Sequence, residues 1–189
     1  MTTMPATTST PKHWDDALEW SAYLESVEQK RDLWLANKRR AKVGEAEAAR
    51  LAALPGARRV LVLTEDWCGD AIRSVPSIAT ALASAPDVEV RFLPIDSFPD
   101  AVDGFLTHGG RAIPIVLVYD EQGTLLGAWG PRPAPLQAML RDRMATEGRP
   151  TSETMGEFYA PIMAWYAQDR GVTVIQELLM LLERGGAPR

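Results

Sequence analysis

The fold depends on one stretch of the chain, Glu65-Asp66-Trp67-Cys68-Gly69-Asp70-Ala71. It follows an apolar run at residues 60–63 and precedes residues that favour a helix, among them Pro76. This order predicts a strand that delivers Cys68 to the first turn of a helix. Unpaired backbone N–H groups and the helix dipole favour a thiolate at that position. Cys68 is therefore the candidate nucleophile, and the alternative is an inert small residue that begins a helix.

The composition is that of a globular protein with a core of ordinary size. The chain has 189 residues, of which 46% are apolar and 24% are charged. The formal net charge of −5 argues against a nucleic-acid partner. Cys68 is the only cysteine, so a framework of disulfide bonds within the chain is excluded.

The sequence predicts neither a targeting segment nor a membrane partner. No run of about 18 apolar residues occurs, so we expect no membrane span. Residues 1–11 are rich in threonine and lack an apolar core, which predicts a disordered lead rather than a signal peptide. We therefore expect a cytoplasmic protein, because a lone thiol stays reduced in that compartment.

Around the Cys68 stretch the sequence predicts alternating strands and helices. Apolar runs bounded by turn residues indicate strands, and apolar residues at three- and four-residue spacings indicate helices. The expected strands are 58–64, 88–93, 113–119 and 124–129, and the expected helices are 69–84, 99–107 and 134–144. A strand–helix–strand unit calls for parallel pairing, and the turn at 120–123 predicts an antiparallel hairpin. We therefore expect an α/β domain over residues 56–146, with a central mixed four-stranded sheet in the order β-α-β-α-β-β-α.

Helical extensions are expected on both sides of this domain. Residues 12–55 carry a helical pattern from about His13, with three tryptophans that we expect to pack in the core: Trp14, Trp20 and Trp34. Residues 147–189 contain Thr154-x-x-Glu157, which predicts a capping box at the start of a helix. The last helix carries an apolar stripe formed by Ile175, Leu178, Leu179 and Leu182. This stripe either packs onto the domain or forms a homodimer interface through the C-terminal helices.

The motifs of the central domain resemble those of the thioredoxin family. Trp67-Cys68-Gly69 is similar to the family's active-site segment, and Pro76 to the proline that kinks its active-site helix. Ile113-Pro114 is similar to the family's cis-proline pair, which faces the active-site sulfur. Further matches are Asp96, Gly123 and Gly130. The resemblance implies a thioredoxin fold with added terminal helices, and the Trp-Cys-Gly-Asp variant is similar to a bacterial subgroup of the family.

Two departures from the family pattern affect the chemistry. The family's second, resolving cysteine would stand at position 71, where this chain has Ala71. The family's buried aspartate, which helps to move protons to the resolving sulfur, would stand at Val62. A dithiol cycle within one chain therefore cannot occur, and a proton shuttle for the missing thiol has no purpose. The sequence also leaves open that position 71 was changed from cysteine in order to trap complexes.

The remaining thiol supports two predicted functions. In the first, a Cys68 thiolate attacks a disulfide to give a mixed disulfide, which a protein thiol or a low-molecular thiol such as glutathione then releases. The resemblance implies that Trp67, Ile113 and Pro114 contact the partner in this monothiol cycle. The alternative is a redox-inactive binding module that recognises an extended segment of a partner protein.

Neighbouring charges decide how reactive Cys68 is. Asp70 disfavours a thiolate, whereas Arg73 and Arg111 could offset it, so the sign of the net pKa shift stays open. His108 is expected to be a loop residue, and its alternative role is a base near the sulfur. One cysteine and two histidines give no metal-ligand spacing, so neither a metal nor another cofactor is expected.

Overall fold

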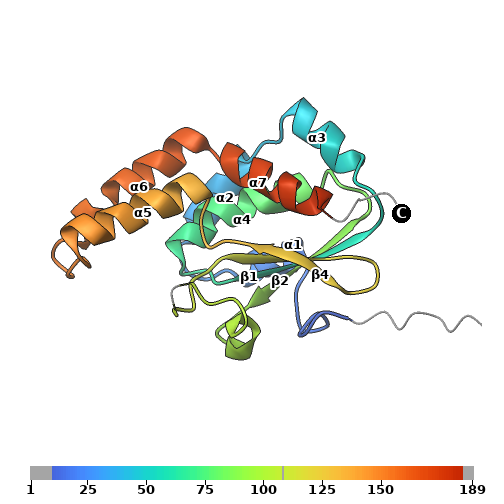
Figure 1. The fold of residues 1–189 in the computed structure, drawn as a ribbon, viewed down its shortest axis with the longest axis horizontal. Helices are drawn as coiled ribbons and strands as arrows, with labels where there is room; N and C mark the ends of the chain where they lie inside the picture. The colour runs from blue at the N-terminus through green and yellow to red at the C-terminus, as the bar shows by residue number, and fades with distance from the viewer. Residues whose placement is uncertain (1–9, 108, 185–189) are drawn as a thin grey trace, which may run out of the picture.

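The computed structural model describes residues 10–107 and 109–184, and one four-stranded sheet lies at its centre (Figure 1). The strands are β1 (Arg58–Thr64), β2 (Val88–Pro94), β3 (Ile115–Tyr119) and β4 (Leu125–Trp129). They lie in the order β2-β1-β3-β4. β1 pairs parallel with β2, whereas β3 pairs antiparallel with both β1 and β4. The predicted mixed sheet is confirmed.

The strand that leads to Cys68 is central and covered on both faces. Val60 and Val62 on one face, and Leu61 and Leu63 on the other, are all buried. A strand buried on both faces has a continuous apolar run rather than an alternating one. β1 leads into α4 (Gly69–Leu82), which connects it to the parallel β2. Figure 1 shows α4 on the same side of the sheet as α2 (Arg31–Arg40), α3 (Glu45–Ala52) and α7 (Val172–Glu183).

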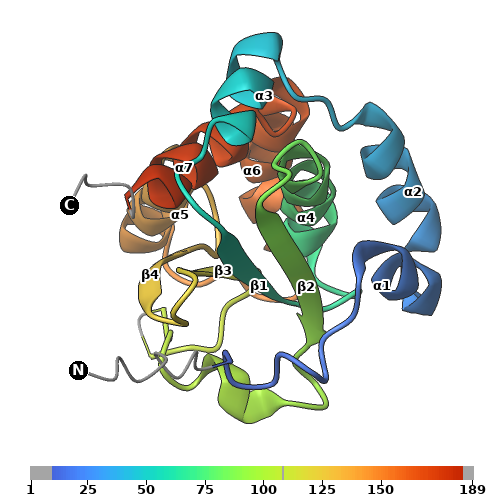
Figure 2. The same cartoon turned by 90° about the vertical axis from the view of Figure 1, so that its right-hand side faces the viewer.

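The N-terminal extension becomes helical later than predicted. Residues from His13 were expected to be helical, but α1 (Trp20–Ser26) begins only at Trp20. Before it, Leu18 exchanges two backbone hydrogen bonds of 2.8 Å with Phe92 of β2. An edge strand leaves N–H and C=O groups unpaired, and Leu18 satisfies them by lying alongside the strand instead of continuing a helix. Figure 2 shows α1 beside β2.

The tryptophans of this extension pack as predicted. Trp34 and Trp14 are buried, and Trp20 packs against the same core while partly exposed. Most of the predicted lead, residues 1–9, lies outside the described residues. Pro11, at its end, is buried, and its carbonyl accepts the Trp14 N–H at 3.1 Å.

The prediction of a helix over residues 99–107 is wrong, because the structure has only a short 3-10 helix there, η1 (Pro99–Val102). Proline suits the first position of a helix, since its missing N–H has no partner there in any case. Gly104 then weakens any continuation of the helix. Thr107 pairs with Gly110 in an isolated bridge, which directs the chain toward β3.

The last helix of the predicted domain and the first helix of the C-terminal extension form a hairpin, and a core helix follows it. α5 (Ala134–Glu147) and α6 (Met155–Asp169) pack around their own cluster of buried side chains: Leu136, Leu140, Phe158, Ile162 and Tyr166. α7 then returns to the domain. Its predicted stripe, Ile175, Leu178, Leu179 and Leu182, is buried in the main core. Packing of this stripe onto the domain is therefore confirmed.

The capping box predicted at Thr154 does not form. Thr154 has helical backbone angles and makes no side-chain cap bond. Its hydroxyl lies 3.3 Å from that of Thr151 instead. An N-cap residue needs an extended backbone to reach the free N–H groups of the next turn, so this geometry prevents the box.

Candidate functional site

Cys68 is the N-cap residue of α4, as the sequence predicted. Its backbone is extended, and its carbonyl accepts the N–H of Ile72 at 3.0 Å to begin the helix. Its own N–H donates to the Glu65 carbonyl at 3.3 Å, which closes the turn after β1. The side chain thus lies where free N–H groups of the helix converge, but it is buried, with only 8% of the residue exposed.

The sulfur lies against the segment that precedes β3. The Cys68 thiol donates to the carbonyl of Ile113, with Sγ 3.3 Å from the oxygen. The Ile113–Pro114 peptide bond is cis, and both residues are buried. β3 begins after this pair, since Pro114 has no N–H to give to a ladder. The structure therefore brings together three of the predicted site residues.

Gly130 allows β4 to pass close to this segment. Its φ is +125°, and a Cβ there would lie 2.2 Å from the Pro114 carbonyl oxygen. Only glycine meets both conditions without strain. The sequence match at Gly130 thus has a steric reason in the packing around Pro114.

The net effect of these surroundings raises the pKa of the Cys68 thiol, which settles a sign that the sequence left open. Burial is the largest cause, and the Asp70 carboxylate adds to it. The N–H groups of Ala71 and Asp70 and the guanidinium of Arg132 act in the opposite direction. Loss of solvent around the sulfur outweighs the helix N-terminus.

Two residues that the sequence reasoning did not select, Arg132 and Tyr166, surround Asp70. An Arg132 Nη2 atom lies 2.5 Å from Asp70 Oδ2, and the side chains are 15% and 13% exposed. The Tyr166 hydroxyl donates to Asp70 Oδ1 at 2.8 Å. We call Asp70, Arg132 and Tyr166 the Asp70 network. Arg132 lies two residues after Gly130, one of the matches to the family, but nothing in the sequence links Tyr166, on α6, to the site.

The two arginines predicted to tune the thiol have other partners. Arg73 donates to the Gly69 carbonyl at 2.7 Å, and its guanidinium carbon lies 6.0 Å from the centroid of the Tyr166 ring. Arg111 is exposed and forms an ion pair with Asp103 at 2.6 Å. The cation that lowers the pKa of Cys68 is Arg132 rather than either of these.

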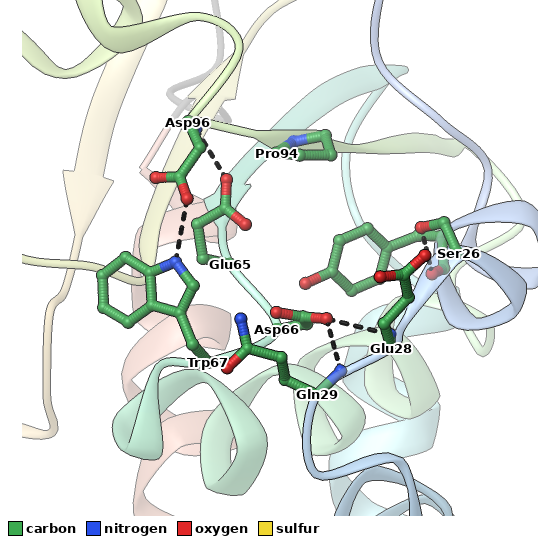
Figure 3. A pocket seen from close by; sticks show the side chains of 9 residues that line it. Ser26, Glu28, Gln29, Glu65, Asp66, Trp67, Pro94 and Asp96 are labelled. Carbon is green, nitrogen blue, oxygen red and sulfur yellow. Dashed lines mark hydrogen bonds between the residues drawn. The ribbon is translucent and has the colours of Figure 1, made fainter.

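An acidic hollow of about 210 Å³ lies beside Trp67, the residue before Cys68 (Figure 3). It is lined by Tyr23, Ser26, Glu28, Gln29, Glu65, Asp66, Trp67, Pro94 and Asp96. Trp67 is 41% exposed, and its Nε1 donates to Asp96 Oδ2 at 3.0 Å. Glu65 is buried and accepts the Asp96 N–H at 2.6 Å, and this burial raises the pKa of its carboxyl. The surface beside Trp67 is therefore aromatic and rich in carboxylates.

The N-terminal extension holds the Cys68 loop in place. Asp66 Oδ2 accepts the backbone N–H groups of Glu28 and Gln29 at 2.9 and 2.8 Å. Trp34 Nε1 donates to the Asp66 carbonyl at 3.0 Å, and Lys30 Nζ donates to the carbonyl of the next residue, Trp67, at 2.8 Å. The sequence indicated only that Trp34 packs in the core, because a side-chain bond to a distant backbone carbonyl leaves no periodic signal.

Two kinds of feature are absent from the described ranges, 10–107 and 109–184. These ranges contain no group of three or more histidine, cysteine or acidic side chains arranged to hold a metal ion. They also contain no helix long and apolar enough to cross a membrane. His108, considered as a base near the sulfur, lies outside them.

Comparisons with known proteins agree with this fold. Two solved structures are similar over almost the whole chain. One is a protein of unknown function from Pseudomonas aeruginosa, with a TM-score of 0.69 and 21% identity over 95% of this chain and 99% of that one. The other is an HIV epitope-scaffold, with a TM-score of 0.66 and 21% identity over 92% of this chain and 96% of that one. At these identities the likeness shows the fold alone. No curated protein matches the sequence. The profile of the thioredoxin family matches residues 17–147, which is most of the chain, and the protein therefore belongs to the thioredoxin family.

Proposed function

We propose that the protein carries out monothiol thiol–disulfide exchange through Cys68. The observation that supports this most directly is the position of the sulfur, at the N-cap of α4 and 3.3 Å from the Ile113 carbonyl beside Pro114. A nucleophile at that position has next to it the backbone that leads into β3, with which an extended partner can pair. Ala71 stands where a second thiol would be needed for a cycle within one chain.

The exchange has two balanced steps. The Cys68 thiolate attacks one sulfur of a disulfide, forms a new S–S bond and expels the other sulfur as a thiolate. A second thiolate, from a protein or a low-molecular thiol, then attacks the partner's sulfur and expels the Cys68 thiolate. Cys68 ends unchanged: the sulfur expelled in the first step is reduced to a thiolate, and the incoming thiol is oxidised as it forms a disulfide with the partner's sulfur.

The raised pKa of Cys68 determines the character of this reaction. Because only the thiolate attacks, the rate at neutral pH is limited by a small ionised fraction and rises with pH. A thiolate with a high pKa is a strong nucleophile but a poor leaving group. The mixed disulfide on Cys68 is therefore expected to form slowly and to persist once formed.

The surroundings favour a protein disulfide over an anionic small molecule. Trp67, Ile113 and Pro114 offer aromatic and backbone contacts to an extended segment, whereas Glu65, Asp66 and Asp96 repel carboxylates near the sulfur. We place this chemistry in the cytoplasm, where a lone thiol stays reduced.

Mixed-disulfide formation tests the proposal. Reduced protein is incubated with bis(2-hydroxyethyl) disulfide, which carries no charge, and its intact mass is followed at pH 9. One adduct on each chain is expected, absent from the Cys68→Ser variant and released by added thiol. A folded protein that forms no adduct over several hours would contradict monothiol exchange.

The burial of Cys68 also favours a second candidate, a redox-inactive module that binds an extended segment. This function needs the backbone around Ile113 and Pro114 but not the sulfur. Selection of extended peptides from a displayed library on reduced protein provides the ligand for its test. Binding retained in Cys68→Ser supports the second candidate, and binding lost in a folded variant under reducing conditions contradicts it.

A further inference from the structure

The Asp70 network joins three separate parts of the chain next to the thiol. Asp70 is the second residue of α4, two positions after Cys68. Arg132 lies between β4 and α5, and Tyr166 lies near the end of α6. The ion pair at 2.5 Å and the hydrogen bond at 2.8 Å occupy both carboxylate oxygens of Asp70.

We infer that Arg132 is a positioning residue for Cys68, which holds and neutralises the Asp70 carboxylate and thereby sets the fraction of Cys68 that is thiolate. This rests on the proposed function, since the ionised fraction matters only if the thiol reacts. Tyr166 acts through the same carboxylate and fixes its orientation. The C-terminal extension is then part of the thiol site rather than an addition to the fold.

The physical reason is the position of a carboxylate at the start of the helix that carries the thiol. An unpaired negative charge there disfavours a second negative charge on the sulfur, and the effect is strong because the site is largely shielded from water. A guanidinium in contact with the carboxylate cancels most of this repulsion. Asp70 also benefits from the helix N-terminus, so it remains in place with its charge.

The other charged and titratable groups around Cys68 do not replace this pair. They are Tyr23 on α1, Glu65 and Asp66 in the turn after β1, and Arg73 on α4. Burial raises the pKa values of Tyr23 and Tyr166, so both stay neutral while Cys68 titrates. Glu65 and Asp66 are held by backbone N–H groups, and Arg73 is directed to the Gly69 carbonyl. Arg132 is thus the cation that faces Asp70.

The pH dependence of Cys68 alkylation by neutral iodoacetamide tests this inference. Arg132→Gln should move the midpoint upward and slow alkylation at pH 7 by about three- to tenfold, because Asp70 loses its counter-charge. Arg132→Lys should restore the wild-type midpoint for the most part. Asp70→Asn should move the midpoint downward, since it removes the repelling charge and leaves Arg132 near the thiol. Arg141→Gln removes an exposed arginine of α5 and serves as the control, with no change expected.

Three outcomes would overturn the inference: an unchanged midpoint in Arg132→Gln, a midpoint in Arg132→Lys that matches Arg132→Gln, or an unchanged or raised midpoint in Asp70→Asn. If Arg132→Gln does not fold, as judged by circular dichroism, the direction in Asp70→Asn decides alone. Alkylation reports the ionised fraction whether or not Cys68 exchanges with disulfides. Failure of the inference is therefore separate from failure of the proposed function, which is judged by mixed-disulfide formation.

Discussion

At the scale of single residues, opposing effects meet at Cys68 and burial prevails. The N–H groups at the start of α4 and the Arg132 guanidinium stabilise a thiolate, while loss of solvent and the Asp70 charge destabilise it. The helix-start position that the sequence predicted for Cys68 is thus correct, and burial gives the pKa shift the upward sign that the sequence left open. Sequence indicates which residues begin a helix, whereas the depth of a side chain depends on the segments that fold over it.

Glu65 allows a prediction on stability, because burial raises the pKa of its carboxyl above the ordinary value of 4.5. The folded state then holds the proton more tightly than the unfolded chain. The stability that Glu65 contributes is present below the unfolded pKa and is lost as pH rises through the higher folded pKa. Glu65→Gln keeps an oxygen for the Asp96 N–H, so it should be more stable than wild type at pH 7.

This advantage should disappear below about pH 4, where wild-type Glu65 is protonated in both states. Urea unfolding of both proteins at pH 7 and below about pH 4 measures this difference in stability. The matched control is Glu153→Gln, an exposed position where little change is expected at either pH. A Glu65→Gln variant that is less stable than wild type at pH 7 would contradict this account of the buried carboxyl.

Gly130 allows a second prediction at this scale. Gly130→Ala places a Cβ 2.2 Å from the Pro114 carbonyl oxygen at a φ of +125°, so the free energy of unfolding should fall by about 2 kcal/mol or more. Gly156→Ala, on α6 with nothing within 4 Å of the new Cβ, should be neutral or stabilising by up to about 1 kcal/mol. Urea titration of both variants checks this, and equal stabilities would be inconsistent with the packing described around Pro114.

At the scale of elements, the two extensions build the site from opposite sides. α1, α2 and the turn between them hold the Asp66–Trp67 backbone, and the hairpin of α5 and α6 supplies Tyr166 to Asp70. These contacts join residues far apart in the chain. Each extension therefore supports the residues around Cys68 through hydrogen bonds as well as through apolar packing.

Tyr166→Phe tests the link between α6 and α4. The change keeps the ring among its apolar neighbours but removes the hydroxyl that donates to Asp70, so stability should fall by about 1 kcal/mol, the typical net value of a hydrogen bond. Tyr159→Phe is the matched control, because the Tyr159 hydroxyl makes no hydrogen bond within residues 10–107 and 109–184. Equal thermal melting temperatures for the two variants would argue against the link.

The elements also show what a sequence can predict and what it cannot. β1 and α4 were predicted closely because a continuous apolar run and a Cys-Gly helix start are local signals. The prediction of a helix from His13 was wrong because Leu18 pairs with Phe92. The prediction of a helix over residues 99–107 was wrong because Gly104 interrupts it. Arg132 and Tyr166 could not be assigned, since tertiary packing alone brings them to Asp70.

At the scale of the whole molecule, we expect charge to influence which disulfides reach Cys68. The chain has a net charge of −5, and the hollow beside Trp67 is lined by carboxylates. Such a field raises the local concentration of cations and lowers that of anions, more strongly at low salt. Small disulfides of different charge therefore report on the approach to Cys68.

Cystamine, which carries two positive charges, should form a mixed disulfide with Cys68 faster than oxidised glutathione does. The rate constant for cystamine is divided by that for oxidised glutathione, and this ratio is divided by the same ratio measured for a model thiol. We expect the corrected ratio to be about tenfold or more at low ionic strength and smaller at about 0.5 M salt. Stopped reactions analysed by intact mass give both rates. A corrected ratio of one at low salt would show that the acidic surroundings do not act on the incoming disulfide.

The most direct test of monothiol exchange is the pH–rate profile for reaction of Cys68 with bis(2-hydroxyethyl) disulfide, compared with a free peptide of residues 65–71. We predict a midpoint above about 8.5, the ordinary cysteine value, because Cys68 is buried in the folded protein. We also predict a limiting rate constant at high pH that exceeds that of the peptide, because the folded site positions the disulfide beside Ile113 and Pro114. A limiting rate constant no greater than that of the peptide would contradict the account and favour a binding module.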